Sequence, residues 1–175
     1  NRKKIDVSVA GKFLGGDGGN YFLSASHFDE AGWRDYSDGK VSNFFGKVNK
    51  NTNFGSVGFM AFLGDSDLLG NGLLPSTNYG VEDDVGEIQE GGLYEARREA
   101  VYSHPDQTKN EVGLISLNFQ NFIDDDTQLN GLIYSRFGRQ KRLGGDVEAE
   151  FEADENEWEF EGEFNNSKTR QNSSG

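Results

Sequence analysis

Residues 21–63 read YFLSASHFDEAGWRDYSDGKVSNFFGKVNKNTNFGSVGFMAFL, in which three strand-like runs are separated by one long and one short connection. Tyr21–Phe28 leads into a loop rich in charged and aromatic residues, and the chain returns over Val41–Val48. It turns within Asn49–Asn53 and leaves again over Phe54–Leu63. A long loop at one end and a tight turn at the other are typical of antiparallel strands that run up and down a sheet.

The same alternation continues on both sides of this stretch. Ile5, Val7 and Val9 alternate with polar residues, and a period of two predicts a strand with one apolar face. Gly15–Asn20 and Ile123–Asp126 have the composition of tight turns. Strands are therefore predicted at about 4–13, 20–28, 41–49, 53–64, 110–122 and 127–137.

The composition suits a sheet with one polar face better than a thick two-layer core. Only 34% of the residues are hydrophobic, and 24 of the 175 residues are Gly. A membrane barrel needs apolar side chains on its lipid face alone, so a mean hydropathy of -0.73 is compatible with one. No run approaches the roughly 20 apolar residues of a transmembrane helix. We predict that 1–175 is all-β, a segment of an antiparallel up-and-down transmembrane β-barrel with short periplasmic turns and long extracellular loops.

The charge is concentrated in one place. The net charge is -13, and 10 acidic residues with no Lys or Arg lie within 146–163, which leaves -3 for the rest of the chain. Nucleic acid is not expected as a partner, because binding phosphates needs a cationic face. The absence of Cys excludes disulfides and cysteine metal sites. The chain begins at Asn1 without Met or a signal peptide, so we expect an internal piece of a larger polypeptide.

Residues 146–164, the acidic hairpin, alternate between acidic and mainly apolar residues in two runs on either side of Asp154–Glu157. We predict a turn at Asp154–Glu157 that sets Phe151 opposite Phe160. This register opposes three glutamate pairs: Glu148 with Glu163, Glu150 with Glu161, and Glu152 with Glu159. Opposed like charges destabilise a sheet. They need compensation from solvent, from nearby basic residues, or from a divalent cation that the six carboxylates would bind.

Little in the sequence points to catalysis. His27 and His104 have no obvious partner, and we expect them to be exposed polar residues rather than a base or a metal ligand. There is no nucleophile elbow, P-loop or dinucleotide fingerprint. We therefore expect neither an enzyme nor a bound cofactor.

Four motifs carry a resemblance to a known family: SHFDEAGWRDYS at 26–37, VSNFFGKV at 41–48, GDSDLLGNGLLP at 64–75 and AVYSHPDQTKNEVGLISL at 100–117. Together they resemble the barrel of TonB-dependent outer-membrane receptors, and look most like the iron-siderophore and ferric-citrate branch. The resemblance implies a barrel of about 22 strands occluded by an N-terminal plug. It implies active uptake of a scarce solute, most of all a ferric siderophore, across the bacterial outer membrane.

The same resemblance implies four partners: outer-membrane lipid, the TonB system acting through a plug, the remaining chains of the same barrel or complex, and the small-molecule ligand. This chain carries no plug and no TonB box. It therefore corresponds to part of a receptor or to a truncated relative. The alternative is a soluble or surface-exposed β-rich binding module with an acidic hairpin, in which the apolar faces meet each other rather than lipid.

Residues for ligand binding are chosen by their chemistry, because ligand contacts in this family lie on variable loops. Trp33 and Arg34 can stack on and pair with an anionic ligand. The basic candidates, expected above a strand end, are Arg136, Arg139, Lys141 and Arg142. The competing interpretation is that these side chains anchor loops or contact lipid phosphates.

Overall fold

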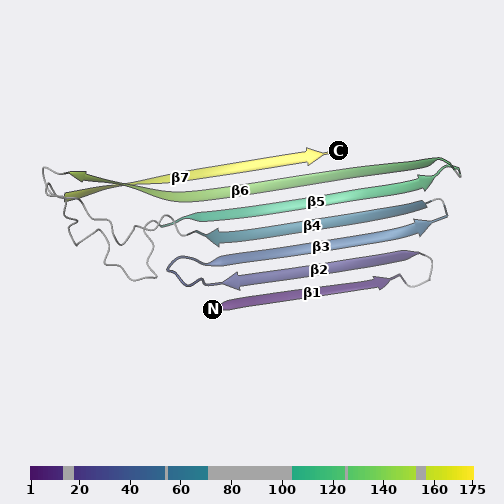
Figure 1. Cartoon of the computed structure of the whole chain (residues 1–175), viewed down its shortest axis with the longest axis horizontal. Helices are drawn as coiled ribbons and strands as arrows, with labels where there is room; N and C mark the ends of the chain where they lie inside the picture. Colours follow the sequence, from purple (N-terminus) through teal and green to yellow (C-terminus); the bar gives the residue numbers. More distant parts are fainter. Residues whose placement is uncertain (14–17, 54, 71–103, 125, 153–156) are drawn as a thin grey trace, which may run out of the picture.

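The computed structural model describes residues 1–13, 18–53, 55–70, 104–124, 126–152 and 157–175, with the backbone alone for 146–152 and 157–161. These residues form one sheet of seven strands in the order β1-β2-β3-β4-β5-β6-β7, and each strand is antiparallel to its neighbours (Figure 1). The strands are β1 (Arg2–Lys12), β2 (Gly19–Glu30), β3 (Gly39–Thr52), β4 (Gly55–Leu69), β5 (Gln107–Phe122), β6 (Gln128–Glu152) and β7 (Glu157–Ser174). The predicted all-β, up-and-down antiparallel arrangement is confirmed.

Strands β1, β3 and β5 end on the right of Figure 1, and β2, β4 and β6 end on the left. The chain between β1 and β2, β3 and β4, and β5 and β6 is short, whereas the two longest connections, after β2 and β4, follow strands that end on the left. In the turn after β5, the backbone N–H of Ile123 donates to the carbonyl of Thr127 at 2.9 Å, and Asp124 Oδ1 accepts from the N–H of Asp126 at 3.0 Å. A hydrogen bond from the Thr127 side chain, together with that N–H, lowers the pKa of the Asp124 carboxyl below its ordinary value.

The six predicted strands are all present, and most extend beyond their predicted ends. The largest difference is β6, which continues without a break from Gln128 to Glu152. The predicted end of this strand at about residue 137 is therefore wrong. The first leg of the acidic hairpin is the end of β6, and the second leg begins β7. Strand β5 pairs with β6 as far as Leu143, so the ladder holds this polar stretch extended.

The predicted register of the acidic hairpin is also wrong, by two residues. The structure sets Ala149 opposite Phe160 and Phe151 opposite Trp158, because the connection spans 153–156 rather than 154–157. Moving the centre of a turn by one residue shifts every pair by two, which leaves each residue on its own face of the sheet. The glutamates are consequently still opposed, as Glu148 with Glu161, Glu150 with Glu159, and Glu152 with Glu157.

The described residues form a single-layer sheet with no hydrophobic core among them. Among the described residues no hydrophobic side chain is buried, and Ser116, at 9% exposure, is the one buried polar residue. Large apolar residues are open to the surroundings, including Ile5 at 62% and Ile133 at 59%. Folded domains normally bury such a face against a second layer. This face therefore needs a cover that the described chain does not itself provide.

Aromatic side chains cover glycines across the strands. Phe137 lies over Gly113, its register partner, and Phe119 lies over Gly131. Added Cβ atoms at either glycine would collide with the ring. The glycines let the rings lie flat on the sheet, which gives the exposed face close contacts within one layer.

Candidate functional site

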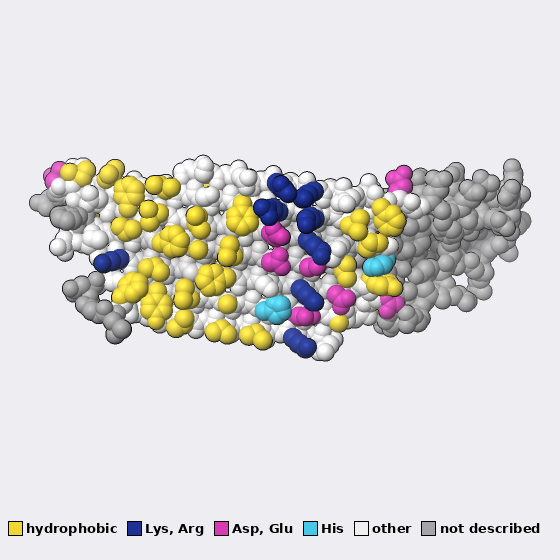
Figure 2. All heavy atoms as spheres, turned by 180° about the vertical axis from the view of Figure 1, so that it is seen from behind, with side chains coloured by type: hydrophobic (Ala, Val, Ile, Leu, Met, Phe, Trp, Pro, Cys, Tyr) yellow, Lys and Arg dark blue, Asp and Glu magenta, His cyan; other side chains and the backbone are white. Residues whose placement is uncertain are grey.

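The register sorts the residues onto two chemically different faces. One face carries an apolar band next to the strand ends that the short turns connect, and Figure 2 shows it as a broad yellow area. The apolar band consists of Ile5, Val7, Val9, Tyr21, Leu23, Ala25, Phe44, Val48, Val57, Phe59, Ala61, Leu63, Ile115, Leu117, Phe119, Leu129, Ile133 and Phe137. On β6 it runs from Leu129 to Phe137, roughly 26 Å along the strand at about 3.3 Å per residue.

A charged stripe lies directly beyond the apolar band on the same face. One row of it crosses the whole sheet, because a charged residue occupies the same level on each of the seven strands. This row is Lys3, Asp29, Lys40, Asp67, Lys109, Lys141 and Lys168, and the next row adds Asp65, Glu111, Arg139 and Arg170. Figure 2 shows the stripe as a line of dark blue and magenta side chains between two yellow areas.

Ion pairs hold the middle of the charged stripe. Lys109 Nζ lies 2.9 Å from Asp67 Oδ2, and the amide of Gln107 donates to Asp67 Oδ1 at 2.6 Å. Arg139 Nη1 lies 3.4 Å from Glu111 Oε2. These side chains are about half exposed, so each pair adds little stability by itself. Beside them is a polar hollow of about 190 Å³ that Lys141 also lines.

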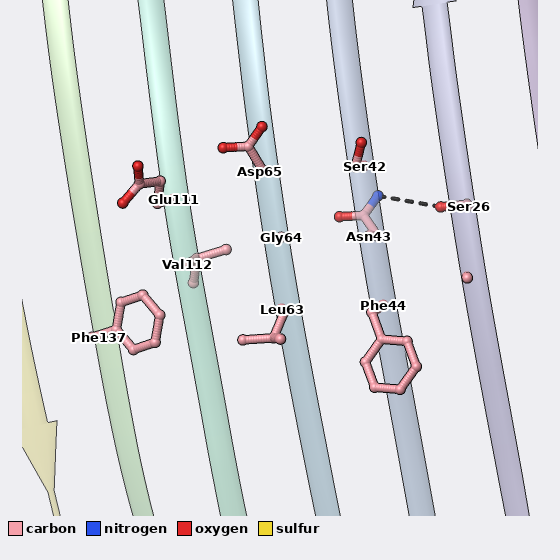
Figure 3. Close-up of a pocket in the computed structure, with 11 residues that line it drawn as sticks. Ser26, Ser42, Asn43, Phe44, Leu63, Gly64, Asp65, Glu111, Val112 and Phe137 are labelled. Atoms are coloured by element: carbon pink, nitrogen blue, oxygen red, sulfur yellow. Dashed lines mark hydrogen bonds between the residues drawn. The ribbon is translucent and has the colours of Figure 1, made fainter.

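An open hollow of about 500 Å³ lies where the apolar band meets the charged stripe. Figure 3 shows Phe44, Leu63 and Phe137 toward one end, and Asp65 and Glu111 toward the other. The hollow is therefore apolar at one end and acidic at the other. It is shallow, and it marks the boundary between an apolar and an ionic environment rather than an enclosed ligand site.

The opposite face, here called the polar face, carries hydrogen-bonded ladders of amides and hydroxyls, interspersed with apolar side chains that include Phe22, Phe45 and Leu132. The amide of Gln140 donates to Asn110 Oδ1 at 2.9 Å, and the amide of Asn110 donates to Ser66 Oγ at 3.1 Å, which links β6, β5 and β4. The amide of Asn49 donates to Asn20 Oδ1 at 3.1 Å, which links β3 and β2. Side chains that pair in this way suit contact with water.

The loop after β2 holds the two predicted aromatic and basic ligand-binding residues. The guanidinium of Arg34 lies 4.5 Å from the centre of the Trp33 ring, and Trp33 is 59% exposed. Ser37 Oγ donates to the carbonyl of Arg34 at 2.7 Å and accepts from its N–H at 3.2 Å. This turn fixes the backbone of Arg34, and its guanidinium lies against the indole of Trp33.

Both histidines have partners, which corrects the expectation that they have none. The ring of His104 stacks on Tyr36 with a centroid distance of 3.8 Å, and this contact joins two loops far apart in the sequence. His27 Nδ1 lies 2.9 Å from Ser42 Oγ across β2 and β3. The predicted exposure of both side chains is confirmed. No signal in the sequence identified either contact, since both depend on register and loop path.

The four basic candidates do not form one cluster. They lie within β6 rather than above a strand end, and alternation puts Arg139 and Lys141 on the apolar face but Arg136 and Arg142 on the polar face. Strands β4 and β5 separate them from the loop of Arg34 in the sheet order. The missed residues Lys168 and Arg170 are the register neighbours of Lys141 and Arg139 and lie on the apolar face.

The remaining metal prediction falls largely outside the described side chains. Of the six glutamates of the acidic hairpin, only Glu163 has a described side chain, and it is exposed. Elsewhere in the described part of the chain, no group of three or more His, Asp or Glu residues is arranged to hold a metal ion. Likewise, no helix in that part is long and apolar enough to cross a membrane. Comparisons with protein-family models, curated proteins and solved structures find no match for this chain.

Proposed function

We propose that this chain forms part of the wall of a TonB-dependent receptor in the bacterial outer membrane. In this arrangement the apolar band contacts lipid, and the polar face lines the interior of the barrel. The observation that carries the proposal is the single-layer sheet, which has a continuous exposed apolar band on one face and hydrogen-bonded amides and hydroxyls among apolar side chains on the other. Transmembrane barrels need such a band on the face toward lipid, while the face toward the interior may be polar.

The energetics of the apolar band support this placement. Burying one large apolar side chain fully is worth about 1.5–3 kcal/mol. The band has many half-exposed residues of this kind, including Val7 at 62% and Leu63 at 50%. An uncovered face of this size in water would promote association. Lipid would cover it without a second protein layer.

The dimensions also support a membrane location. At the strand tilt of about 35–45° in such barrels, the roughly 26 Å from Leu129 to Phe137 corresponds to a height of about 20 Å. This is close to the apolar band of about 25 Å in outer-membrane barrels. The charged stripe then lies at the boundary with water, and the short turns lie on the opposite side of the membrane.

The transport role rests on the resemblance of the four sequence motifs. The receptor would take up a scarce solute, with a ferric siderophore as the leading candidate, and TonB would supply the energy through a plug. Trp33 and Arg34 are the proposed ligand contacts on the outer side, since the indole and guanidinium already lie together. A negatively charged ferric complex would meet both a cation and an aromatic surface there.

Spin labels on β4 and β5 test the membrane placement. Labels at Leu117 and Phe59 lie on the apolar face, and a label at Asn118 lies on the polar face. In native envelopes we expect the first two to be relaxed by oxygen and shielded from a water-soluble nickel chelate, and Asn118 to show the reverse. If Leu117 and Phe59 are shielded from both reagents, the face packs on protein, and the binding-module alternative is correct.

Uptake of radiolabelled ferric citrate tests the transport role separately. Cells that express the native protein should accumulate iron only when TonB is energised, and Arg34→Ala should reduce uptake while leaving the protein in the outer membrane. Lys12→Ala, at the opposite end of the strands from Arg34, is the matched control. Uptake that is independent of TonB would contradict the proposal.

A further inference from the structure

We propose that Arg139, Lys141, Lys168 and Arg170 bind the phosphate groups of an anionic lipid whose acyl chains cover the apolar band. This cationic site lies on β6 and β7, at one end of the charged stripe. The inference rests on the proposed function, because it needs the apolar face to contact lipid.

The arrangement of positive and negative charges differs between the two ends of the stripe. From β1 to β5 the row alternates as Lys3, Asp29, Lys40, Asp67 and Lys109. Each cation there has a carboxylate at the neighbouring position, and the pair of Lys109 and Asp67 is formed at 2.9 Å. The alternation therefore compensates the charges within the protein.

On β6 and β7 this compensation stops. Lys141 is the register partner of Lys168, and Arg139 is the register partner of Arg170, so two pairs of cations are directly opposed. Arg139 has Glu111 at 3.4 Å, whereas none of the ion pairs among the described residues involves the other three. Directly opposed like charges destabilise a sheet, and a bound anion would remove the repulsion.

The position of the site selects a lipid phosphate. Arg139 follows Phe137 by two residues on the same face, and Phe137 is the last residue of the apolar band on β6. A lipid whose chains lie along the band would place its headgroup at this level. Arginine forks bind phosphate oxygens in pairs, and lysines add mobile charge. Figure 2 shows the dark blue side chains gathered at this end of the stripe, with magenta intermixed nearer to β1.

A lipid-selectivity measurement tests the site. The full-length protein is reconstituted into phosphatidylcholine vesicles, and its association with spin-labelled phosphatidylglycerol is compared with that of spin-labelled phosphatidylcholine. We expect the native protein to prefer the anionic lipid. Lys168→Gln with Arg170→Gln should lower this preference by roughly fivefold per charge removed, because each basic residue at an anionic surface contributes a factor of that order.

A matched variant controls for the loss of charge. Lys3→Gln with Lys40→Gln removes two cations from the alternating part of the same row and should leave the preference within about twofold. Equal losses in the two double variants would overturn the site, as would no loss in either. Loss of the preference in excess inorganic phosphate, with no requirement for acyl chains, would assign the site to free phosphate and overturn the lipid proposal.

The oxygen accessibility of a label at Leu117 separates the two proposals. If Leu117 contacts lipid but the Lys168 and Arg170 variant keeps its selectivity, only the site is refuted. If Leu117 does not contact lipid, the proposed function fails as well. The same label reports on folding of the variants, because a misfolded protein would lose the contrast between Leu117 and Asn118.

Discussion

Replacing Leu117 by arginine would put a charge at the centre of the apolar band, midway between the charged stripe and the strand ends that carry the short turns. Leu117 is 40% exposed, so removing it forfeits roughly 0.6–1.2 kcal/mol of lipid contact out of the 1.5–3 kcal/mol for a whole side chain. The charge adds the larger part of the cost. Arginine at the midplane of an outer-membrane barrel costs about 2–4 kcal/mol in total.

Guanidinium unfolding of the protein in lipid vesicles, followed by tryptophan fluorescence, measures this loss. Two other substitutions on β5 serve as controls. Asn118→Arg places the charge on the polar face, and Asn121→Arg places it on the same face as Leu117 but near the turn. We expect less than about 0.5 kcal/mol for the first and about 0–1 kcal/mol for the second. Equal costs at Leu117 and Asn118 would refute the assignment of faces, and a small cost at Leu117 would refute lipid contact.

Three further predictions test other parts of the structure. Gly113→Val should destabilise the sheet by about 1–3 kcal/mol because its side chain would meet the ring that covers this glycine, whereas Gly138→Val enters open space and should cost much less by the same unfolding assay. A cysteine at Ser37 should react with an impermeant maleimide in intact cells and one at Asn51 should not, since the two lie at opposite edges; equal labelling would refute the orientation. Calorimetric titration with calcium should give heat that Glu150→Gln reduces if the acidic hairpin binds a cation, and no heat in the native protein would exclude that role.

Local pattern accounts for the strands because alternation is a property of consecutive residues. The period of two in Ile5, Val7 and Val9 requires only that one face is more apolar than the other. The tight turns are equally local, since turn residues act through their own backbone angles. The loop with Trp33 and Arg34 is a candidate on composition alone, because stacking and ion pairing are properties of these side chains.

The charged stripe is different, because its members are far apart in the sequence. Lys3 and Lys168 share one row only after six registers are set, and each register depends on where the centre of a turn falls. The acidic hairpin shows how sensitive this is, since a turn displaced by one residue moved every pair by two. A local pattern cannot find such a row.

Alternation in the sequence determined which residues of each strand share a face, and turn composition determined that the strands run up and down. Only the tertiary structure decided that β6 continues through Arg139 and Lys141 and that these residues meet Arg170 and Lys168. The physical reason is that side-chain direction follows from the pleat of one strand. Cross-strand neighbours follow from hydrogen-bond ladders between strands, which the sequence specifies only when the whole sheet is assembled.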